Sequence, residues 1–118
     1  MIKIYDRIVE EDIVVMSLEG KLSGLQGRGA IQEKLKRLSE DKKNKVKNVI
    51  LNLSRVSWID STGLGELIAS LSSIKKMGGN LVLADIPGPV ESLLKMTNLH
   101  QIFDTYDDVE TALGDLQG

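Results

Sequence analysis

The residues with the clearest chemical potential lie at positions 60–65, which read Asp-Ser-Thr-Gly-Leu-Gly. They place a carboxylate and two hydroxyls directly before an amphipathic helix pattern. A helix start gathers unpaired backbone N–H groups and the positive end of the helix dipole, so it tolerates anions. A hydroxyl at this place could carry a phosphate, although the adjacent Asp60 would oppose the added charge.

The same run has a simpler interpretation as a helix cap. Capping needs one suitable residue and contributes about 1 kcal/mol. Three candidates, Asp60, Ser61 and Thr62, exceed that need, and Gly63 and Gly65 would each cost about 1 kcal/mol inside a helix. A second explanation for this cost is that another molecule approaches the bare backbone of the glycines closely. The residues alone leave these two interpretations about equal.

Signals for an enzyme are weak. Ser61 has Ile59 two positions upstream, where a nucleophile elbow needs glycine. The glycines of the helix start form only part of a dinucleotide-binding motif, because Ile68 stands where a third small residue is required. His100 is the single histidine, and no nucleophile is paired with it in the sequence. The absence of cysteine excludes disulfides, thiolate catalysis and cysteine-ligated zinc. We therefore expect no catalysis, no metal and no cofactor.

Charge is distributed unevenly along the chain, although the net charge is only -2. Residues 21–47 carry a net +6, and residues 85–118 carry a net -6. The basic segment lacks interleaved aromatic residues, so we expect a solvated helix face and no nucleic-acid site. A second interpretation is that the two poles guide the docking of a protein partner.

The length of 118 residues predicts one domain over 1–118. No signal-peptide pattern opens the sequence, and no apolar run approaches the length of a membrane span. We expect a soluble cytoplasmic protein that does not bind membranes. Monomer is the default expectation, because no long apolar edge or heptad seam stands out.

The elements that must position the 60–65 run can be read from periodicity and turn signals. In order, we expect strands over 2–9 and 13–19, a helix over 26–41, a strand from 49 with a loop over 54–58, a helix over 62–77, a strand over 81–84, a helix over 89–98, a strand over 102–103 and a last helix capped by Thr105 or Asp107. This order predicts an α/β fold: a mostly parallel sheet of four to five strands, a leading antiparallel hairpin and about four helices.

The run VILNLSRVSWIDSTGLGEL, followed by KKMGGNLVLA, resembles the STAS domain and, within it, the bacterial anti-sigma factor antagonists. The likeness covers nearly the whole chain, from a hairpin ending in Gly20 to the helix near residue 99. It implies that Ser61 is the phosphorylation site and that Thr62 is not the usual acceptor. The resemblance also implies that the partner contacts this end of the domain; the expected contact residues are Ser23, Asp60, Ser61, Thr62, Gly63 and Gly65.

The resemblance further implies regulation of transcription by partner switching. The unphosphorylated antagonist would bind an anti-sigma factor of the histidine-kinase-like ATPase type. That partner would phosphorylate Ser61 and release the antagonist, and a metal-dependent serine/threonine phosphatase would reset it. One departure from the family pattern is Ser23, which follows Gly20-Lys21-Leu22 where aspartate is common.

Two other functions stay open at this point. One is a STAS module that is not phosphorylated and serves as a scaffold or accessory subunit of a signalling or transport complex. The other is a small-ligand binder that holds a nucleotide phosphate at the glycines of the 60–65 run.

Overall fold

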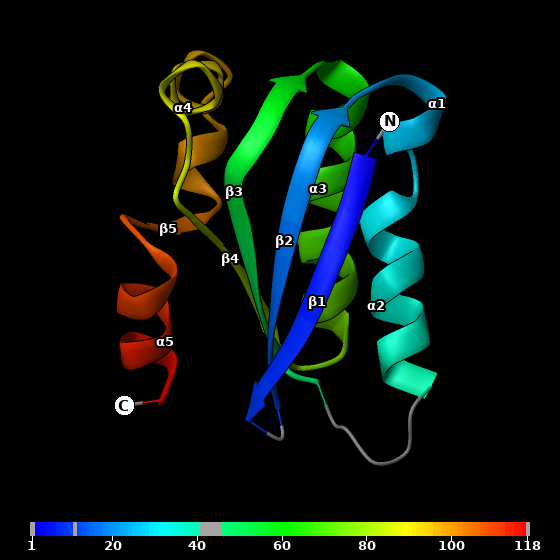
Figure 1. Ribbon diagram of the computed structural model, residues 1–118, viewed down its shortest axis with the longest axis vertical. Coiled ribbons are helices and arrows are strands. Elements are labelled where there is room, and N and C mark those ends of the chain that lie inside the picture. Colours follow the sequence, from blue (N-terminus) through cyan, green and yellow to red (C-terminus); the bar gives the residue numbers. More distant parts are fainter. Residues whose placement is uncertain (1, 11, 41–45, 118) are drawn as a thin grey trace.

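The computed structural model describes residues 2–10, 12–40 and 46–117. Its centre is a five-stranded sheet with the order β1-β2-β3-β4-β5 (Figure 1). The strands are β1 Ile2–Glu10, β2 Ile13–Leu22, β3 Asn48–Ile59, β4 Asn80–Ala84 and β5 Asp104–Tyr106. β1 pairs with β2 in antiparallel fashion, and the other pairs are parallel. The expected α/β fold with an antiparallel edge is confirmed.

Helices cover both faces of this sheet. They are α1 Gly24–Gly27, α2 Ala30–Glu40, α3 Ser61–Lys76, α4 Gly88–Met96 and α5 Val109–Gln117, with a short 3-10 turn, η1 Leu99–Gln101, after α4. α2 and α3 lie side by side on one face, whereas α5 covers part of the other face (Figure 1). The sheet therefore separates a large core from a smaller one under α5.

The strand sequences match this layering. In β2, Val14, Met16 and Leu18 point into the large core, while Ile13 and Val15 point toward α5. A strand covered on both faces needs apolar residues at consecutive positions, which explains the unbroken apolar run at its start. Leucine, isoleucine and valine supply most of the buried side chains.

β3 is longer than the periodicity predicts. The loop expected over 54–58 is wrong, because the strand runs on to Ile59. β2 also extends, to Leu22, and gives this polar stretch a partner: Lys21 lies opposite Trp58 and Leu22 opposite Ile59. Two irregularities in the β2–β3 register accompany the extension. β3 therefore leads into α3 through the single residue Asp60.

Two further boundaries differ from the prediction. The helix expected over 26–41 is divided into α1 and α2, because Gly29 has a φ of 78° that an α-helix cannot contain; position 41 lies outside the described residues. The strand expected over 102–103 lies at Asp104–Tyr106, since Phe103 is buried in the large core. Asp108 caps α5 in place of Thr105 or Asp107, accepting a hydrogen bond from the Thr111 N–H at 2.7 Å.

Candidate functional site

The site occupies the end of the sheet where β2 and β3 finish and α1 and α3 begin (Figure 1). Asp60 is the N-cap of α3, and its Oδ1 accepts a hydrogen bond from the Gly63 N–H at 2.9 Å. Its Oδ2 accepts a second one from the Gly24 N–H at 3.1 Å. One carboxylate thus joins the starts of two helices, which the cap interpretation from sequence did not include.

Ser61 is the first residue of α3, and its side chain is exposed. In the part of the chain that the structure describes, no side-chain hydrogen bond involves the Ser61 hydroxyl. Thr62 follows it and is half-buried. A reagent or enzyme in solvent can therefore reach the Ser61 oxygen, and the helix start lies directly behind it.

The two glycines of the run have different surroundings. A Cβ added to Gly63 would lie 2.0 Å from the carbonyl oxygen of Leu22, which is a steric clash. A Cβ on Gly65 would meet no atom within 4 Å. Gly63 is therefore required by the close approach of β2 in the same chain. Only Gly65 presents the bare, exposed backbone that the second sequence interpretation proposed for both.

Ser23 lies directly after β2, in extended conformation with φ -154° and ψ 158°. It precedes α1, but its side chain makes no capping hydrogen bond. Its carbonyl accepts from the Gly27 N–H at 2.9 Å. Asp60 binds the next N–H along the chain, that of Gly24, so Ser23 and Asp60 lie at the same corner of the site.

Glu66 is a residue of this region that the sequence analysis missed. Its side chain is only 4% exposed, and both oxygens face the start of α2. They accept hydrogen bonds from the N–H groups of Gly29, Ile31 and Gln32 at 2.8, 2.8 and 2.9 Å, and from the Gln32 side-chain amide at 2.8 Å. The start of α2 follows Gly29, which has no side chain to cap the free N–H groups of the helix. That missing cap is the sequence signal that could have prompted a search for a distant carboxylate.

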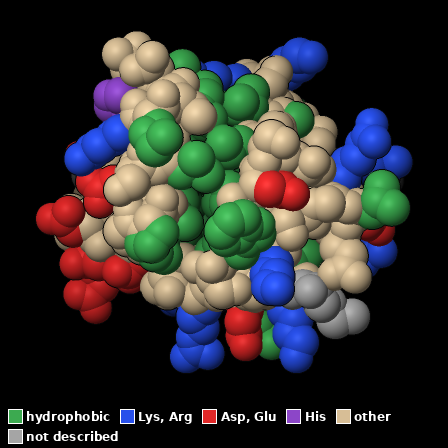
Figure 2. Space-filling view, turned by 90° about the horizontal axis from the view of Figure 1, so that it is seen from above, with side chains coloured by type: hydrophobic (Ala, Val, Ile, Leu, Met, Phe, Trp, Pro, Cys, Tyr) green, Lys and Arg blue, Asp and Glu red, His purple; other side chains and the backbone are tan. Residues whose placement is uncertain are grey.

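An apolar groove runs beside Ser61. It has a volume of about 480 Å³ and lies between α4 and the junction of β3 with α3. Figure 2 shows hydrophobic side chains gathered over this end of the molecule. The main apolar residues of its lining are Trp58, Ile59, Leu64, Pro89, Leu93 and Met96. Trp58 and Met96 are 59% and 81% exposed, which is unusual for large apolar side chains.

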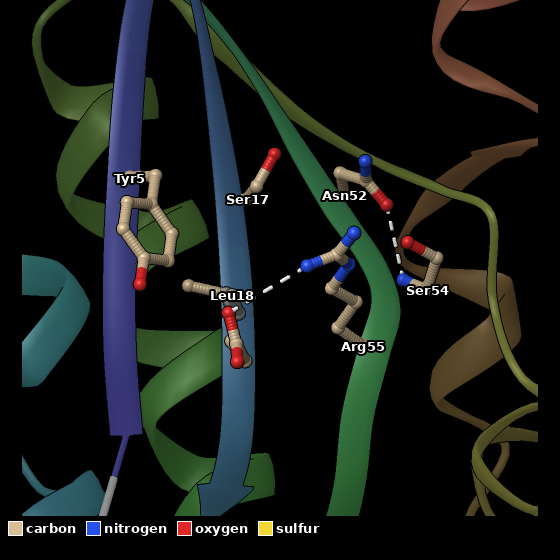
Figure 3. A pocket seen from close by; sticks show the side chains of 7 residues that line it. Tyr5, Ser17, Leu18, Asn52, Ser54 and Arg55 are labelled. Carbon is tan, nitrogen blue, oxygen red and sulfur yellow. Dashed lines mark hydrogen bonds and ion pairs between the residues drawn. The ribbon is translucent and has the colours of Figure 1, made fainter.

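A second hollow lies on the face of the sheet opposite α3, over the middle of β1, β2 and β3 (Figure 3). Polar groups line most of it, including Tyr5, Ser17 and Asn52. Arg55 pairs with Glu19 across it at 3.9 Å. Ser61 and the other residues expected at the site do not belong to this hollow.

The geometry gives little support to metal or nucleotide chemistry. Across the described ranges, no three acidic or histidine side chains converge to hold a metal ion. The Gly63 N–H is already bound to Asp60, and β2 covers that glycine, so it offers no open phosphate loop. His100 is exposed in η1, on a different element from Ser61. No helix in the described part of the chain is both long and apolar enough to cross a membrane.

The sequence and the fold resemble those of known proteins. The family model described as the STAS domain matches residues 5–112. An anti-sigma F factor antagonist from Paenibacillus polymyxa is 33% identical over 70 residues. That alignment covers 59% of this chain and 60% of the relative, so the matched segment spans less than two thirds of the relative's length.

Solved structures share the fold over nearly the whole chain. A Thermotoga maritima protein, provisionally named an anti-sigma factor antagonist, superposes with a TM-score of 0.84 at 27% identity, covering 98% of this chain and 95% of that one. The antagonist SpoIIAA in its unphosphorylated form gives 0.75 at 21% identity, with 98% and 97% covered. Its phosphorylated form gives 0.68 at 19% identity, with 97% and 99% covered. The SpoIIAA likeness concerns the fold.

Proposed function

The chain belongs to the STAS domain family, and from this premise we propose that it is an anti-sigma factor antagonist that is switched off by phosphorylation of Ser61. The observation that carries the proposal is the exposed Ser61 hydroxyl at the first position of α3, beside the Asp60 cap. The unphosphorylated chain binds an anti-sigma factor and thereby releases a sigma factor. The proposal assigns no catalysis to the chain itself and places it in the cytoplasm.

The electrostatics of the site support such a switch. A phosphate adds about -1.5 to -2 charges at neutral pH. The helix start can accept that charge. However, the adjacent Asp60 carboxylate already accepts hydrogen bonds from the Gly63 and Gly24 N–H groups. A partner packed against Ser61 would have to bury a dianion beside a carboxylate. A loss of about 3 kcal/mol would lower the affinity more than a hundredfold, and no refolding is needed.

The proposed partners follow from the family. The anti-sigma factor is of the histidine-kinase-like ATPase type and acts as the serine kinase; a metal-dependent serine/threonine phosphatase removes the phosphate. The contact surface includes Ser23, Asp60, Ser61, Thr62 and Gly65. Gly63 supports this surface from within, because Leu22 covers it.

The test is phosphorylation by the histidine-kinase-like anti-sigma factor encoded in the same genome. We expect incubation with that protein and ATP to add one phosphate to the wild type and to Thr62→Ala, and none to Ser61→Ala. Intact-mass measurement gives the count. Calorimetry should then show that the phosphorylated chain binds at least about a hundredfold more weakly. Label that persists in Ser61→Ala, or binding that phosphate leaves unchanged, would contradict the proposal.

A further inference from the structure

We propose that the apolar groove beside Ser61 holds an amphipathic helix of the anti-sigma factor, with acidic side chains along the edge of that helix that faces β2. This inference rests on the proposed function and identifies the surface through which it operates. The groove lies at Ser61 and Asp60, both of which line it. Its occupant would therefore be in direct contact with the proposed switch.

The shape of α4 favours a helical occupant. Val90 and Leu94 are the buried residues of α4 and pack into the large core. Pro89, Leu93 and Met96 form a second apolar stripe at i, i+4 and i+7, and it lines the groove. One α-helix packs on another through ridges of this spacing, and amphipathic helices bind grooves by such anchors. Leu93 also packs partly against the large core, whereas Met96 is 81% exposed and is available to a partner.

Trp58 forms the opposite wall of the groove. It lies near the end of β3 and is 59% exposed, although it is the only tryptophan in the chain. Tryptophan is among the residues that contribute most to binding when a partner covers them. Together with Met96 on α4, it gives the groove two large, exposed apolar walls.

Basic charge on the β2 side of the groove defines one edge of the occupant. The exposed acidic residues Asp104 and Asp107 do not flank the groove, because β5 is level with residues 50–52 of β3, at least six residues before Trp58. On the β2 side, Lys21 lies opposite Trp58 in the strand register, and Arg28 is exposed after α1. A helix with an acidic edge on this side would match Lys21 and Arg28.

Charge within α4 itself does not set this preference. Glu91 and Lys95 pair along the helix at 3.3 Å and largely cancel each other. The charge complementarity therefore depends on Lys21 and Arg28. A phosphate on Ser61 would place a dianion at the edge of the groove, where the occupant's apolar face begins. Eviction of the helix would then follow from desolvation and repulsion together.

The experiment compares two exposed methionines. Met96→Glu changes the groove, and Met77→Glu is the matched control at the far end of α3, where Met77 is 46% exposed. Both variants, and Trp58→Ala, are checked for folding by circular dichroism. Calorimetry then measures the affinity of each unphosphorylated chain for the co-encoded anti-sigma factor. We expect Met96→Glu and Trp58→Ala to bind at least about tenfold more weakly and Met77→Glu to match the wild type.

Two partner-specific readouts identify the occupant. The chain labelled with 5-fluorotryptophan has one ¹⁹F signal, from Trp58, and this signal should shift when the unlabelled anti-sigma factor is added. Hydrogen exchange on the anti-sigma factor should show protection of an amphipathic helix with an acidic edge. Protection of a loop or strand alone would overturn the inference.

The failure of this inference can be distinguished from that of the proposed function. If the wild type binds the anti-sigma factor and both groove variants bind equally well, the groove is not the contact and only this inference fails. If the wild type does not bind at all, both proposals fail. Sedimentation that shows a wild-type dimer broken by Met96→Glu would make a second copy the occupant and overturn the inference as well.

Discussion

Glu66 on α3 holds Gln32 on α2 by two hydrogen bonds, one from the backbone N–H at 2.9 Å and one from the side-chain amide at 2.8 Å. No cation accompanies this carboxylate among the ion pairs of the described ranges. Its charge is stabilised by N–H donors at a helix start, which compensate for burial. Glu66 follows Ser61 by little more than one turn. Together with the hydrogen bond that the Gly24 N–H donates to Asp60, it fixes the segment beside the proposed switch.

Replacing Glu66 with glutamine should destabilise the fold. The glutamine nitrogen would face N–H donors, so at least one buried bond would be lost and the donors left unsatisfied. We expect the free energy of unfolding to fall by about 1–3 kcal/mol, measured by urea denaturation. Glu33→Gln is the control, because Glu33 pairs with Arg37 on the exposed surface of α2. Its effect should stay below about 0.5 kcal/mol. Equal effects from the two variants would contradict the structural role of Glu66.

Gly63→Ala and Gly65→Ala should have opposite effects on stability. The new methyl group at position 63 would meet the Leu22 carbonyl, and strain of this kind costs about 1–3 kcal/mol. The methyl group at position 65 would point into open space, and alanine favours the helix by about 0.5–1 kcal/mol. Urea denaturation of both variants gives the comparison. A stable Gly63→Ala chain would mean that β2 does not approach α3 as described.

Much of this fold can be predicted from local sequence, and the reasons are physical. The apolar run at the start of β3 and the helical periodicity from Leu64 onward each depend on neighbouring residues. The helix start at Asp60–Gly63 was also predicted, because capping is local. The continuation of β3 through its polar residues was not, since it depends on pairing with β2, which is distant in sequence. The same holds for Glu66, whose bonds span 34 to 37 residues.

The candidate site was predicted in part. The exposure of Ser61 at a helix start agrees with the sequence analysis, whereas the roles of Gly63 and Gly65 required coordinates. The groove could not be inferred from sequence, because the apolar residues of a short helix do not show which of them reach the core. Only the packing of α4 shows that Pro89, Leu93 and Met96 line a groove while Val90 and Leu94 are buried in the large core.

Asp108 should stabilise the fold in a pH-dependent way. The Thr111 backbone N–H, followed by the Thr111 side chain, holds the pKa of this carboxyl below its usual range. The charged form is therefore favoured by folding, so the stabilisation is present above the pKa of the unfolded chain and is lost as pH falls through the folded pKa. We expect Asp108→Ala to lower the free energy of unfolding at neutral pH, and the difference from the wild type to vanish in acid.

The neighbouring Asp107 provides the control for this cap. It is exposed, and the α5 capping bond is made by Asp108. Asp107→Ala should therefore unfold at nearly the same urea concentration as the wild type across the acidic range. If both alanine variants lose the same stability, the effect would come from general charge in the acidic segment.

Tyr106 should make stability fall at high pH. Its hydroxyl donates a hydrogen bond to Asp115, and this bond, with burial and the nearby charges of Asp115 and Asp104, raises the pKa of Tyr106 from 10.0 to about 12. Folding thus favours the neutral phenol. Its contribution is complete below pH 10, where the unfolded chain also keeps the proton, and it is lost as pH rises from 10 to 12.

The comparison with Tyr106→Phe isolates this contribution, because phenylalanine neither titrates nor binds Asp115. We expect the free energy of unfolding of the wild type to fall more steeply above pH 10 than that of the variant. In a Tyr5→Phe background, tyrosinate absorbance reports Tyr106 alone, and Asp115→Asn should lower its titration midpoint by removing the strongest cause of the shift. A midpoint that Asp115→Asn leaves unchanged would mean that the bond between β5 and α5 does not govern this titration.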